Sequence, residues 1–304
     1  MIEAQGAVIP QACIKAGDCA ILSDIRKIIW IAAYPKSGST WLRLFVAQLL
    51  AGSGDAPSIR DQVLRVPVDF GLLGFDEALG IKLADLTPDE AITLKPLRLE
   101  AEARHLSRPG LYRTHDAWIR TEEGGARLSA RATAGAIHLV RDPRDIAVSF
   151  AEFFDCDQDE AIARMADPGY RLDFDPDAVA GPQLPILLLD WSSHCRSWLT
   201  AEEVPRLLIR YEDLLVDPVG EFTRMAAFAA LPTASEQIAA AVEATRFDRL
   251  KARDRQEGFA LRGDGRSHFR VGRAGGWQAA LTPAQVRRIE RDHGEMMVRL
   301  GYAL

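Results

Sequence analysis

Short runs of apolar residues recur along the chain, and each is followed within a few residues by a segment with helical periodicity. Three such strand–helix units are present: Ile28–Ala33 with Ser39–Leu50, Ala136–Val140 with Pro143–Phe154, and Leu207–Tyr211 with Pro218–Ala230. Apolar runs of this length, bounded by turn residues, are typical of strands that are buried on both faces. The pattern predicts a parallel sheet with helices packed against it.

Other parts of the chain complete or interrupt this pattern. A further strand is expected over Leu111–Thr114, and a charged surface helix over Pro283–Gly301. The stretches 52–109 and 155–185 mix Pro, Gly and Asp with scattered aromatic residues, and connections of this length are usually functional or carry small helices. Alternation of strands and helices across the chain predicts a single α/β domain with a doubly wound parallel sheet flanked by helices, after an N-terminal extension of residues 1–27.

Composition narrows the class of protein. The chain has 304 residues, of which 48% are hydrophobic and 26% charged, and its formal net charge is −6. A chain of this size can bury a large core. Its acidic balance argues against a nucleic-acid-binding protein, which would carry a broad basic surface. Any bound anion must therefore be held by a local group of cations.

The N-terminus and the cysteines bear on the cellular compartment. Residues 1–20 are interrupted by polar residues and by Pro10, and no apolar run reaches the roughly 18 residues of a transmembrane helix. The absence of an export signal and the low cysteine content favour a cytoplasmic protein. No two cysteines form a C-x-x-C pair, so no metal is expected; they are Cys13, Cys19, Cys156 and Cys195.

The turn after the first strand is the most informative segment. Tyr34-Pro-Lys-Ser-Gly-Ser-Thr-Trp41 leads from the strand into the expected helix. The free N–H groups and the dipole of a helix start suit a bound oxyanion. Gly38 allows the backbone to approach such an anion closely, and Lys36 adds a positive charge. Hydroxyl donors follow at Ser37, Ser39 and Thr40. The spacing is not that of a Walker A motif, and an ordinary capped turn is the alternative.

The second strand–helix unit repeats this arrangement. Arg141 stands at the carboxyl end of the strand, where open α/β sheets bind ligands. Its guanidinium can hold a phosphate through two hydrogen bonds, and Ser149 follows about two turns into the helix. From the pattern alone, a salt bridge from Arg141 to Asp142 or Asp145 is an equal alternative.

A candidate base and a basic loop lie elsewhere in the chain. His115 follows the expected strand at Leu111–Thr114, and histidine can accept a proton near neutral pH; a structural or surface role is the alternative. Trp191, His194 and Trp198 share one helix face, which favours core packing over catalysis. Residues 261–276 are rich in Gly and Arg, and a mobile cationic loop of this kind can fold over a polyanion.

Together these segments resemble the PAPS-dependent sulfotransferases, which transfer a sulfuryl group from 3′-phosphoadenosine-5′-phosphosulfate (PAPS) and release 3′-phosphoadenosine-5′-phosphate (PAP). Tyr34–Trp41 resembles the family's 5′-phosphosulfate loop, and Ile137–Phe150 its 3′-phosphate motif. Arg113-Thr-His115 is similar to its K-T-H segment, and Phe269–Trp277 to its R-K-G-x-x-G-D-W loop. The resemblance runs from about residue 28 to residue 277, except for the long connections.

The resemblance implies a P-loop-like domain over residues 28–304. In it, segments 52–109 and 155–185 form the variable acceptor side, and residues 261–276 close over the cofactor. His115 is implied as the catalytic base, and Lys36 as the cation at the oxygen that bridges sulfur and phosphorus. The implied cofactor-binding residues are Lys36, Ser37, Gly38, Ser39, Thr40, Trp41, Arg141, Ser149, Tyr211, Thr245, Phe247, Arg270, Val271 and Gly272.

Three positions depart from the family pattern. Arg113 replaces the lysine before the base, Val271 replaces the lysine of the closing loop, and Gly276 replaces its aspartate. Arginine keeps the charge of lysine but not its hydrogen-bonding geometry, so His115 is the firmer assignment. Loss of the lysine at position 271 is expected to weaken cofactor binding, with Arg273 as a substitute.

The expected function is sulfuryl transfer from PAPS to a hydroxyl or amine of a small-molecule, lipid or glycan acceptor. A nucleotide-dependent phosphotransferase on a related fold and a non-catalytic PAP-binding protein are the two rivals. The aromatic residues of the acceptor-side segments fit an apolar or planar acceptor, although core packing explains them equally well; they include Phe70, Phe75, Tyr170 and Phe174. The sequence leaves the acceptor and the oligomeric state open, a homodimer included.

Overall fold

The central sheet of the computed structural model has four strands, all parallel, in the order β2-β1-β3-β6. The strands are β1 (Ile28–Ala33), β2 (Gly110–Thr114), β3 (Thr133–Val140) and β6 (Arg206–Arg210). The structure describes residues 26–52, 58–69, 75–82, 85–120, 126–173, 184–257, 269 and 271–304. Within them the sheet is that of the predicted doubly wound α/β fold.

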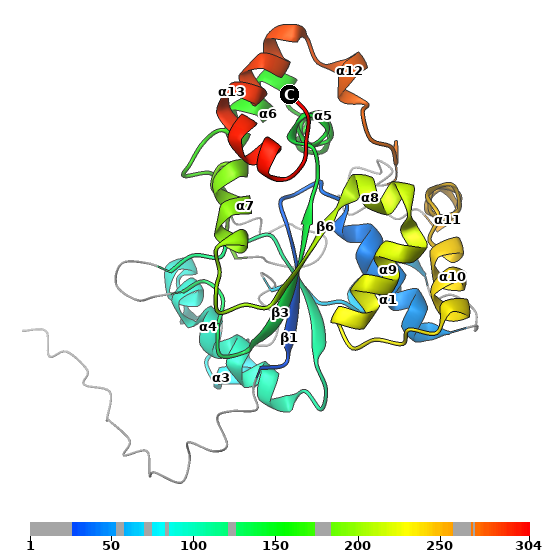
Figure 1. The fold of residues 1–304 in the computed structure, drawn as a ribbon. Helices are drawn as coiled ribbons and strands as arrows, with labels where there is room; N and C mark the ends of the chain where they lie inside the picture. Colours follow the sequence, from blue (N-terminus) through cyan, green and yellow to red (C-terminus); the bar gives the residue numbers. More distant parts are fainter. Residues whose placement is uncertain are drawn as a thin grey trace, which may run out of the picture.

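Helices cover both faces of this sheet, so that β1 is buried along its whole length (Figure 1). The helices around it are α1 (Ser39–Ala51), α4 (Pro88–His105), α7 (Trp191–Leu199), α9 (Pro218–Phe228) and α10 (Ser235–Ala244). Ile29 and Ile31 pack with α1, α9 and α10, whereas Trp30 on the other face packs with α4 and α7. Burial of alternate side chains on opposite faces is the reason that the strand is a continuous apolar run.

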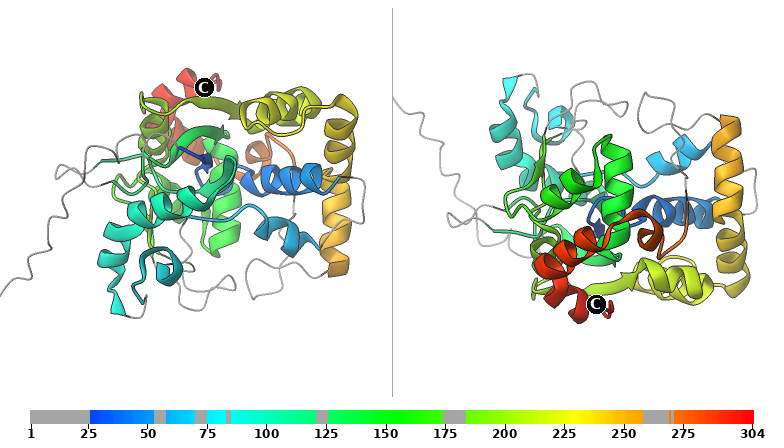
Figure 2. Two further views of the ribbon diagram at one scale, coloured as in Figure 1. Left: turned by 90° about the horizontal axis from the view of Figure 1, so that it is seen from below. Right: turned by 90° about the horizontal axis from the view of Figure 1, so that it is seen from above.

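A further group of helices packs together around a separate part of the core. These are α5 (Pro143–Phe154), α6 (Gln158–Met165), α12 (Trp277–Ala280) and α13 (Pro283–Arg299). The predicted surface helix α13 therefore buries one face, which includes Met296 and Met297. The small elements are α2 (Ile59–Leu64), α3 (Phe75–Leu79), α8 (Tyr211–Val216), α11 (Phe247–Glu257) and the antiparallel pair β4 (Arg171–Leu172) and β5 (Ile186–Leu187). Figure 2 shows α10 and α11 on the outer side of α1.

The structure differs from the sequence prediction at two places that matter for the site. Tyr211 was expected to end the third strand, but it is the first residue of α8, where Glu212 and Asp213 stabilise the helix start. The stretch 52–109 was expected to be irregular or to carry small helices, but it contains the 18-residue helix α4. A capping box of Thr87 and Glu90 starts that helix. Among the described helices, none combines the length and the apolar character needed to cross a bilayer.

Helix α4 contributes a buried cation next to β2. Lys95 is fully buried and forms ion pairs with Asp69 and Asp116. Asp116 also accepts a hydrogen bond from Nε of Arg127 at 2.7 Å, and the hydroxyl of Thr114 donates to Asp69 at 3.0 Å. Thr114 and Asp116 flank the candidate base, so this network fixes the chain on both sides of position 115.

The network generates a prediction about stability. Lys95→Met leaves the buried carboxylate of Asp69 without a cation and that of Asp116 with Arg127 alone, and we expect the free energy of unfolding to fall by about 3–5 kcal/mol. Chemical denaturation measures this change. Arg104→Met, at an exposed position of the same helix, is the control and should change stability by less than about 0.5 kcal/mol. Equal stability of the two variants would contradict a role for the network.

Candidate active site

The loop between β1 and α1 contains two residues with positive φ. Lys36 has φ 71° and Gly38 has φ 104°, and a non-glycine residue in this region is conformationally strained. At Gly38, an added Cβ would lie only 2.7 Å from Cδ2 of Tyr211, so glycine is required for packing as well. Gly38 is also the N-cap of α1 and has no side chain to cap the first turn. The N–H groups of that turn are therefore suited to an external anion.

The hydroxyl groups of this loop are buried within it. Ser37, Ser39 and Thr40 are 1%, 5% and 9% exposed. Within the described residues, Oγ of Ser37 has no hydrogen-bond partner. A buried oxygen without a partner is costly, and a phosphate bound at this loop would supply one. The ammonium of Lys36 lies 4.0 Å from the centroid of the Phe153 ring on α5.

Arg141 links this loop to two other segments. It donates a hydrogen bond to the carbonyl of Lys36 at 3.0 Å and another to the carbonyl of Arg273 at 3.2 Å. Its guanidinium also lies 4.5 Å from the centroid of the Tyr211 ring. The salt bridge considered from sequence is not formed, because Asp142 pairs with Arg144 and Asp145 accepts backbone N–H groups instead.

One face of α5 runs along the same region. Asp145, Ser149 and Phe153 are spaced by four residues and therefore share this face. At its N-terminal end, Asp145 accepts hydrogen bonds from the N–H groups of Gly275 at 2.7 Å and Trp277 at 3.0 Å. At its C-terminal end, Phe153 contacts Lys36. Ser149 is half-buried and lies on this face one turn from each of these two contacts.

Two of the implied cofactor-binding residues pack against an apolar cluster beside α1. Trp41 and Phe247 both pack against this cluster, which consists of Leu44, Ile59, Val63, Leu250 and Phe269. The Trp41 and Tyr211 rings meet edge to face, with centroids 6.2 Å apart. The hydroxyl of buried Thr245 donates to the carbonyl of Ala241 at 2.8 Å, so only its lone pairs remain for a ligand.

The loop 261–276, which the resemblance implies closes over the cofactor, is described only in part, and the described residues 271–277 are called the closing segment for that implied role. Gly272 has φ 63°, and an added Cβ would fall 2.1 Å from the ring of Phe247, so this position also requires glycine. Val271 is 49% exposed, and the side chain of Arg273 is exposed as well. Arg270 and residues 261–268 of the predicted loop lie outside the described residues, as do Phe70 and Phe174. Phe75 is fully buried, which favours the core-packing interpretation for that side chain.

His115 lies at the carboxyl edge of the sheet, beside the end of β1. Its Nδ1 is 2.6 Å from the carbonyl of Ala33, so Nδ1–H donates there and Nε2 carries the lone pair. Burial, followed by the positive charge of Arg113, holds the pKa of His115 well below its ordinary value. The imidazole is therefore neutral, which is the state a general base requires.

Arg113 contacts the candidate base directly, which the sequence did not predict. Its Nη1 is 3.0 Å from Nε2 of His115 and donates to it. Burial lowers the pKa of Arg113 to about 10, which still leaves the guanidinium charged at neutral pH. Positions 113 and 115 are two residues apart on an extended segment and so share a face, and this spacing was the signal available in the sequence.

Comparison with known proteins decides the family. The family model described as "Sulfotransferase domain" matches residues 26–301, nearly the whole chain. The chain belongs to this family. Among curated relatives, sulfotransferase 2B1 of Homo sapiens is 24% identical over 278 residues, which cover 88% of this chain and 66% of the human protein. Sulfotransferase 1A1 of Canis lupus familiaris is 25% identical over 281 residues, covering 89% and 83% of the two chains.

Two solved structures of other proteins have the same fold as this sulfotransferase-family chain. Mouse sulfotransferase SULT7A1 complexed with PAP superposes with a TM-score of 0.56 at 19% identity, covering 92% of this chain and 88% of the mouse chain. Retinol dehydratase in complex with retinol and PAP gives a TM-score of 0.58 at 18% identity, covering 95% and 86%. These likenesses confirm the P-loop-like α/β fold.

A pocket of about 410 Å³ in this sulfotransferase domain is lined partly by Ala274, Gly275 and Trp277. Four acidic side chains line it, those of Asp142, Asp145, Glu212 and Glu290, together with Arg144 and the C-terminal residues Ala303 and Leu304. A polyanion is disfavoured there, because like charges repel. The cationic loop around Lys36 and Arg141 is therefore the better candidate for phosphate binding.

The hydrogen bonds that Asp145 accepts from Gly275 and Trp277 lead to a second prediction. Asp145→Asn keeps one acceptor oxygen but loses the charge, so the hydrogen bonds to Gly275 and Trp277 weaken. We expect the amide hydrogens of residues 275–277 to exchange several-fold faster, measured by hydrogen–deuterium exchange. Glu236→Gln, in the exposed first turn of α10, is the control and should leave this segment unchanged. Identical exchange rates in Asp145→Asn and the parent protein would contradict the anchoring role.

Proposed function

We propose that this protein transfers the sulfuryl group of PAPS to a hydroxyl or amine of an acceptor. The observation that supports this most is the joining of the phosphate loop to Arg141, whose guanidinium donates to the carbonyl of Lys36 at 3.0 Å. Two anion-binding segments at the ends of neighbouring strands can engage one adenosine compound that carries phosphates at both its 5′ and 3′ positions.

The residues around these segments fit such a compound. Gly38 opens the backbone to a 5′-phosphate, and the unpartnered hydroxyl of Ser37 offers it a hydrogen bond. Arg141 and Ser149 are proposed to hold the 3′-phosphate, together with Arg270 and the segment at Val271 and Gly272. The adenine is proposed to lie near Trp41, Tyr211, Thr245 and Phe247; Nε1 of Trp41 is also without a hydrogen-bond partner in the described structure.

The chemistry we propose is an in-line displacement at sulfur. PAPS supplies the sulfuryl group and leaves as PAP when the bond from sulfur to the bridging oxygen breaks. Nε2 of His115 takes the proton of the acceptor as the acceptor's oxygen or nitrogen bonds to sulfur. The ammonium of Lys36 stabilises the negative charge that develops on the bridging oxygen. The carbonyl of Ala33 holds His115 in the tautomer that this step requires.

Arg113 bears on the acceptor side of this mechanism. It donates a hydrogen bond to Nε2 of His115, so the acceptor's hydroxyl or amine must displace that bond to reach the base. Its guanidinium then lies beside the reacting atoms as a fixed positive charge. We propose that the acceptor binds between His115 and Phe153, within the small-molecule, lipid and glycan classes, and that segments 52–109 and 155–185 select among them.

Incubation with sulfur-labelled PAPS and a panel of phenols, sterols, sugars and amines tests the function. Label should move to at least one acceptor without added metal. Phosphate transfer from ATP–Mg²⁺ in place of label transfer would favour a phosphotransferase, and PAP binding without any turnover would favour a binding protein.

A third prediction concerns the two catalytic assignments. His115→Ala should lose roughly 10²–10⁴-fold in turnover because the proton acceptor is gone. Lys36→Ala should lose about 10²-fold or more because the leaving oxygen is no longer stabilised. Affinity of His115→Ala for PAP should stay within a few-fold of the parent. Steady-state rates and calorimetry measure these changes, with Arg224→Ala, at an exposed position of α9, as control; unchanged turnover in His115→Ala would remove it as the base.

A fourth prediction tests the proposed contact between Arg141 and the 3′-phosphate of the cofactor. Arg141→Lys keeps the charge but loses the guanidinium fork, so PAP affinity should fall roughly 10–100-fold, the equivalent of about 1.5–3 kcal/mol. Adenosine 5′-monophosphate lacks the 3′-phosphate, and its affinity should change far less. Calorimetry with both ligands measures the difference. Equal losses for the two ligands would indicate that Arg141 only supports the loop around Lys36.

A further inference from the structure

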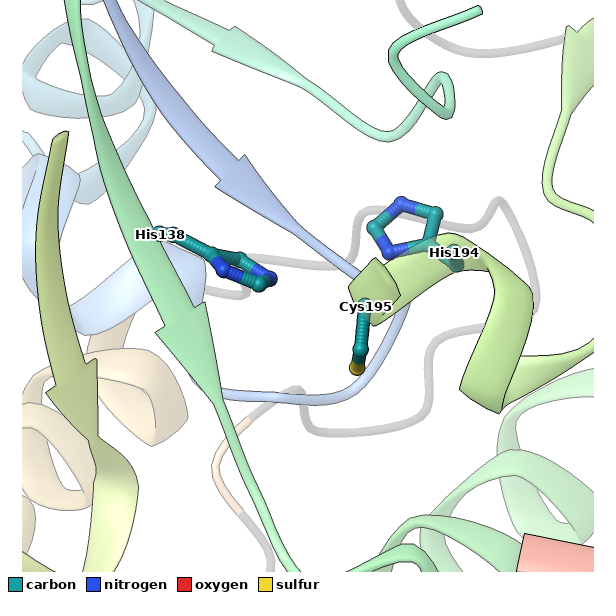
Figure 3. A group of neighbouring side chains, drawn as sticks. All are labelled: His138, His194 and Cys195. Atoms are coloured by element: carbon teal, nitrogen blue, oxygen red, sulfur yellow. The ribbon is translucent and has the colours of Figure 1, made fainter. Parts of the chain in front are cut away.

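Three potential metal ligands lie together in the core. His138 is on β3, and His194 and Cys195 are consecutive residues of α7. They are 1%, 0% and 1% exposed, and one ligand atom from each lies within 4.8 Å of the others. Figure 3 shows His138 extending from its strand toward the turn of α7 that carries His194 and Cys195. No metal was expected from the sequence, because no local pattern brings position 138 close to positions 194 and 195.

These side chains have buried polar atoms without partners. Within the described residues, neither ring nitrogen of His138 has a hydrogen-bond partner, and neither does Nδ1 of His194. Burial of an imidazole without hydrogen bonds costs free energy, and a native structure rarely leaves such groups unsatisfied without a reason. A cation between the three side chains would use the lone pairs that the protein leaves unpaired.

The other nitrogen of His194 is already fixed. Its Nε2–H donates to the backbone carbonyl of His115 at 3.2 Å. This contact assigns the proton to Nε2 and leaves the lone pair on Nδ1, toward the cluster. Histidines that bind metals typically donate their second N–H to a carbonyl or carboxylate, which fixes the tautomer and the ring orientation. His194 therefore has the supporting contact of a metal ligand.

We propose that His138, His194 and Cys195 form a zinc-binding site. Imidazole nitrogen and thiolate sulfur are preferred zinc ligands, at about 2.0–2.1 Å and 2.3 Å respectively. Tetrahedral geometry with these bonds separates the ligand atoms by about 3.3–3.6 Å. The present separations of up to 4.8 Å must therefore close by about 1 Å, which small side-chain rotations provide.

Zinc binding to these three side chains releases one proton. The thiol of Cys195 gives up its proton as the sulfur–zinc bond forms, and both imidazoles bind in the neutral form.

Three protein ligands leave the fourth position of a tetrahedral zinc for another donor. The hydroxyl of Tyr34 is also buried without a partner in the described residues, and its ring centroid is 5.3 Å from that of His194. Zinc would join β3 to α7 and hold the backbone at His115. This assignment does not depend on the proposed sulfuryl transfer.

The test uses the full chain with a single thiol. The triple variant C13S/C19S/C156S removes every cysteine except Cys195. After treatment with a chelator, it should bind one equivalent of Zn²⁺ by calorimetry and melt at a higher temperature with zinc than without. Co²⁺, used as a spectroscopic substitute for zinc, should give a near-ultraviolet charge-transfer band from the thiolate.

Two further variants in this background distinguish the site from adventitious binding. Cys195→Ser should abolish the thiolate band and weaken zinc binding by at least about 10-fold. His138→Leu replaces an unsatisfied imidazole with an apolar side chain, so the metal-free protein should melt no earlier than its parent but lose the zinc-dependent rise. Absence of zinc binding to the single-thiol protein, or a Co²⁺ band that persists in Cys195→Ser, would overturn the proposal.

Discussion

The guanidinium of Arg141 joins three segments that are remote in sequence. It donates to the carbonyl groups of Lys36 and Arg273 and lies over the ring of Tyr211. These contacts depend on the parallel register, which pairs Ala33 with Leu139 and Val140 with Arg210. Because the carboxyl ends of three neighbouring strands meet at one edge, the loops after them converge on a single cation. The order and register of the strands therefore position the candidate site as much as the loops do.

Much of this arrangement could be predicted from sequence, because its signals are local. An apolar run, a turn and a capped helix are encoded within about twenty residues, so Ile28–Ala33 and Pro143–Phe154 were predicted with the bounds that the structure has. Helix α4 was missed even though Thr87, Pro88 and Glu90 form a clear start signal. Its buried face carries Lys95, Arg98 and Glu100, and these charges hide the apolar periodicity that normally reveals a helix.

The parts of the site that could not be predicted are contacts across the fold. Sequence could name His115 and Arg141, but not the hydrogen bond that Arg113 makes to the first or the carbonyl groups that orient the second. In the same way, His194 was expected to be a core residue, and its complete burial confirms this. Its proximity to His138 follows only from the packing of α7 on the sheet, for which no local pattern exists.

The strand order also has a consequence for how the chain acquires its structure. β1 occupies an inner position of the sheet, yet residue 28 pairs with residues 110 and 133, which leave the ribosome much later. Until those partners emerge, a wholly apolar strand has no sheet to join, and contacts of such long range make folding slow and prone to aggregation. We expect the nascent protein to depend on chaperones until β3, the second of the two partners of β1, has been synthesised.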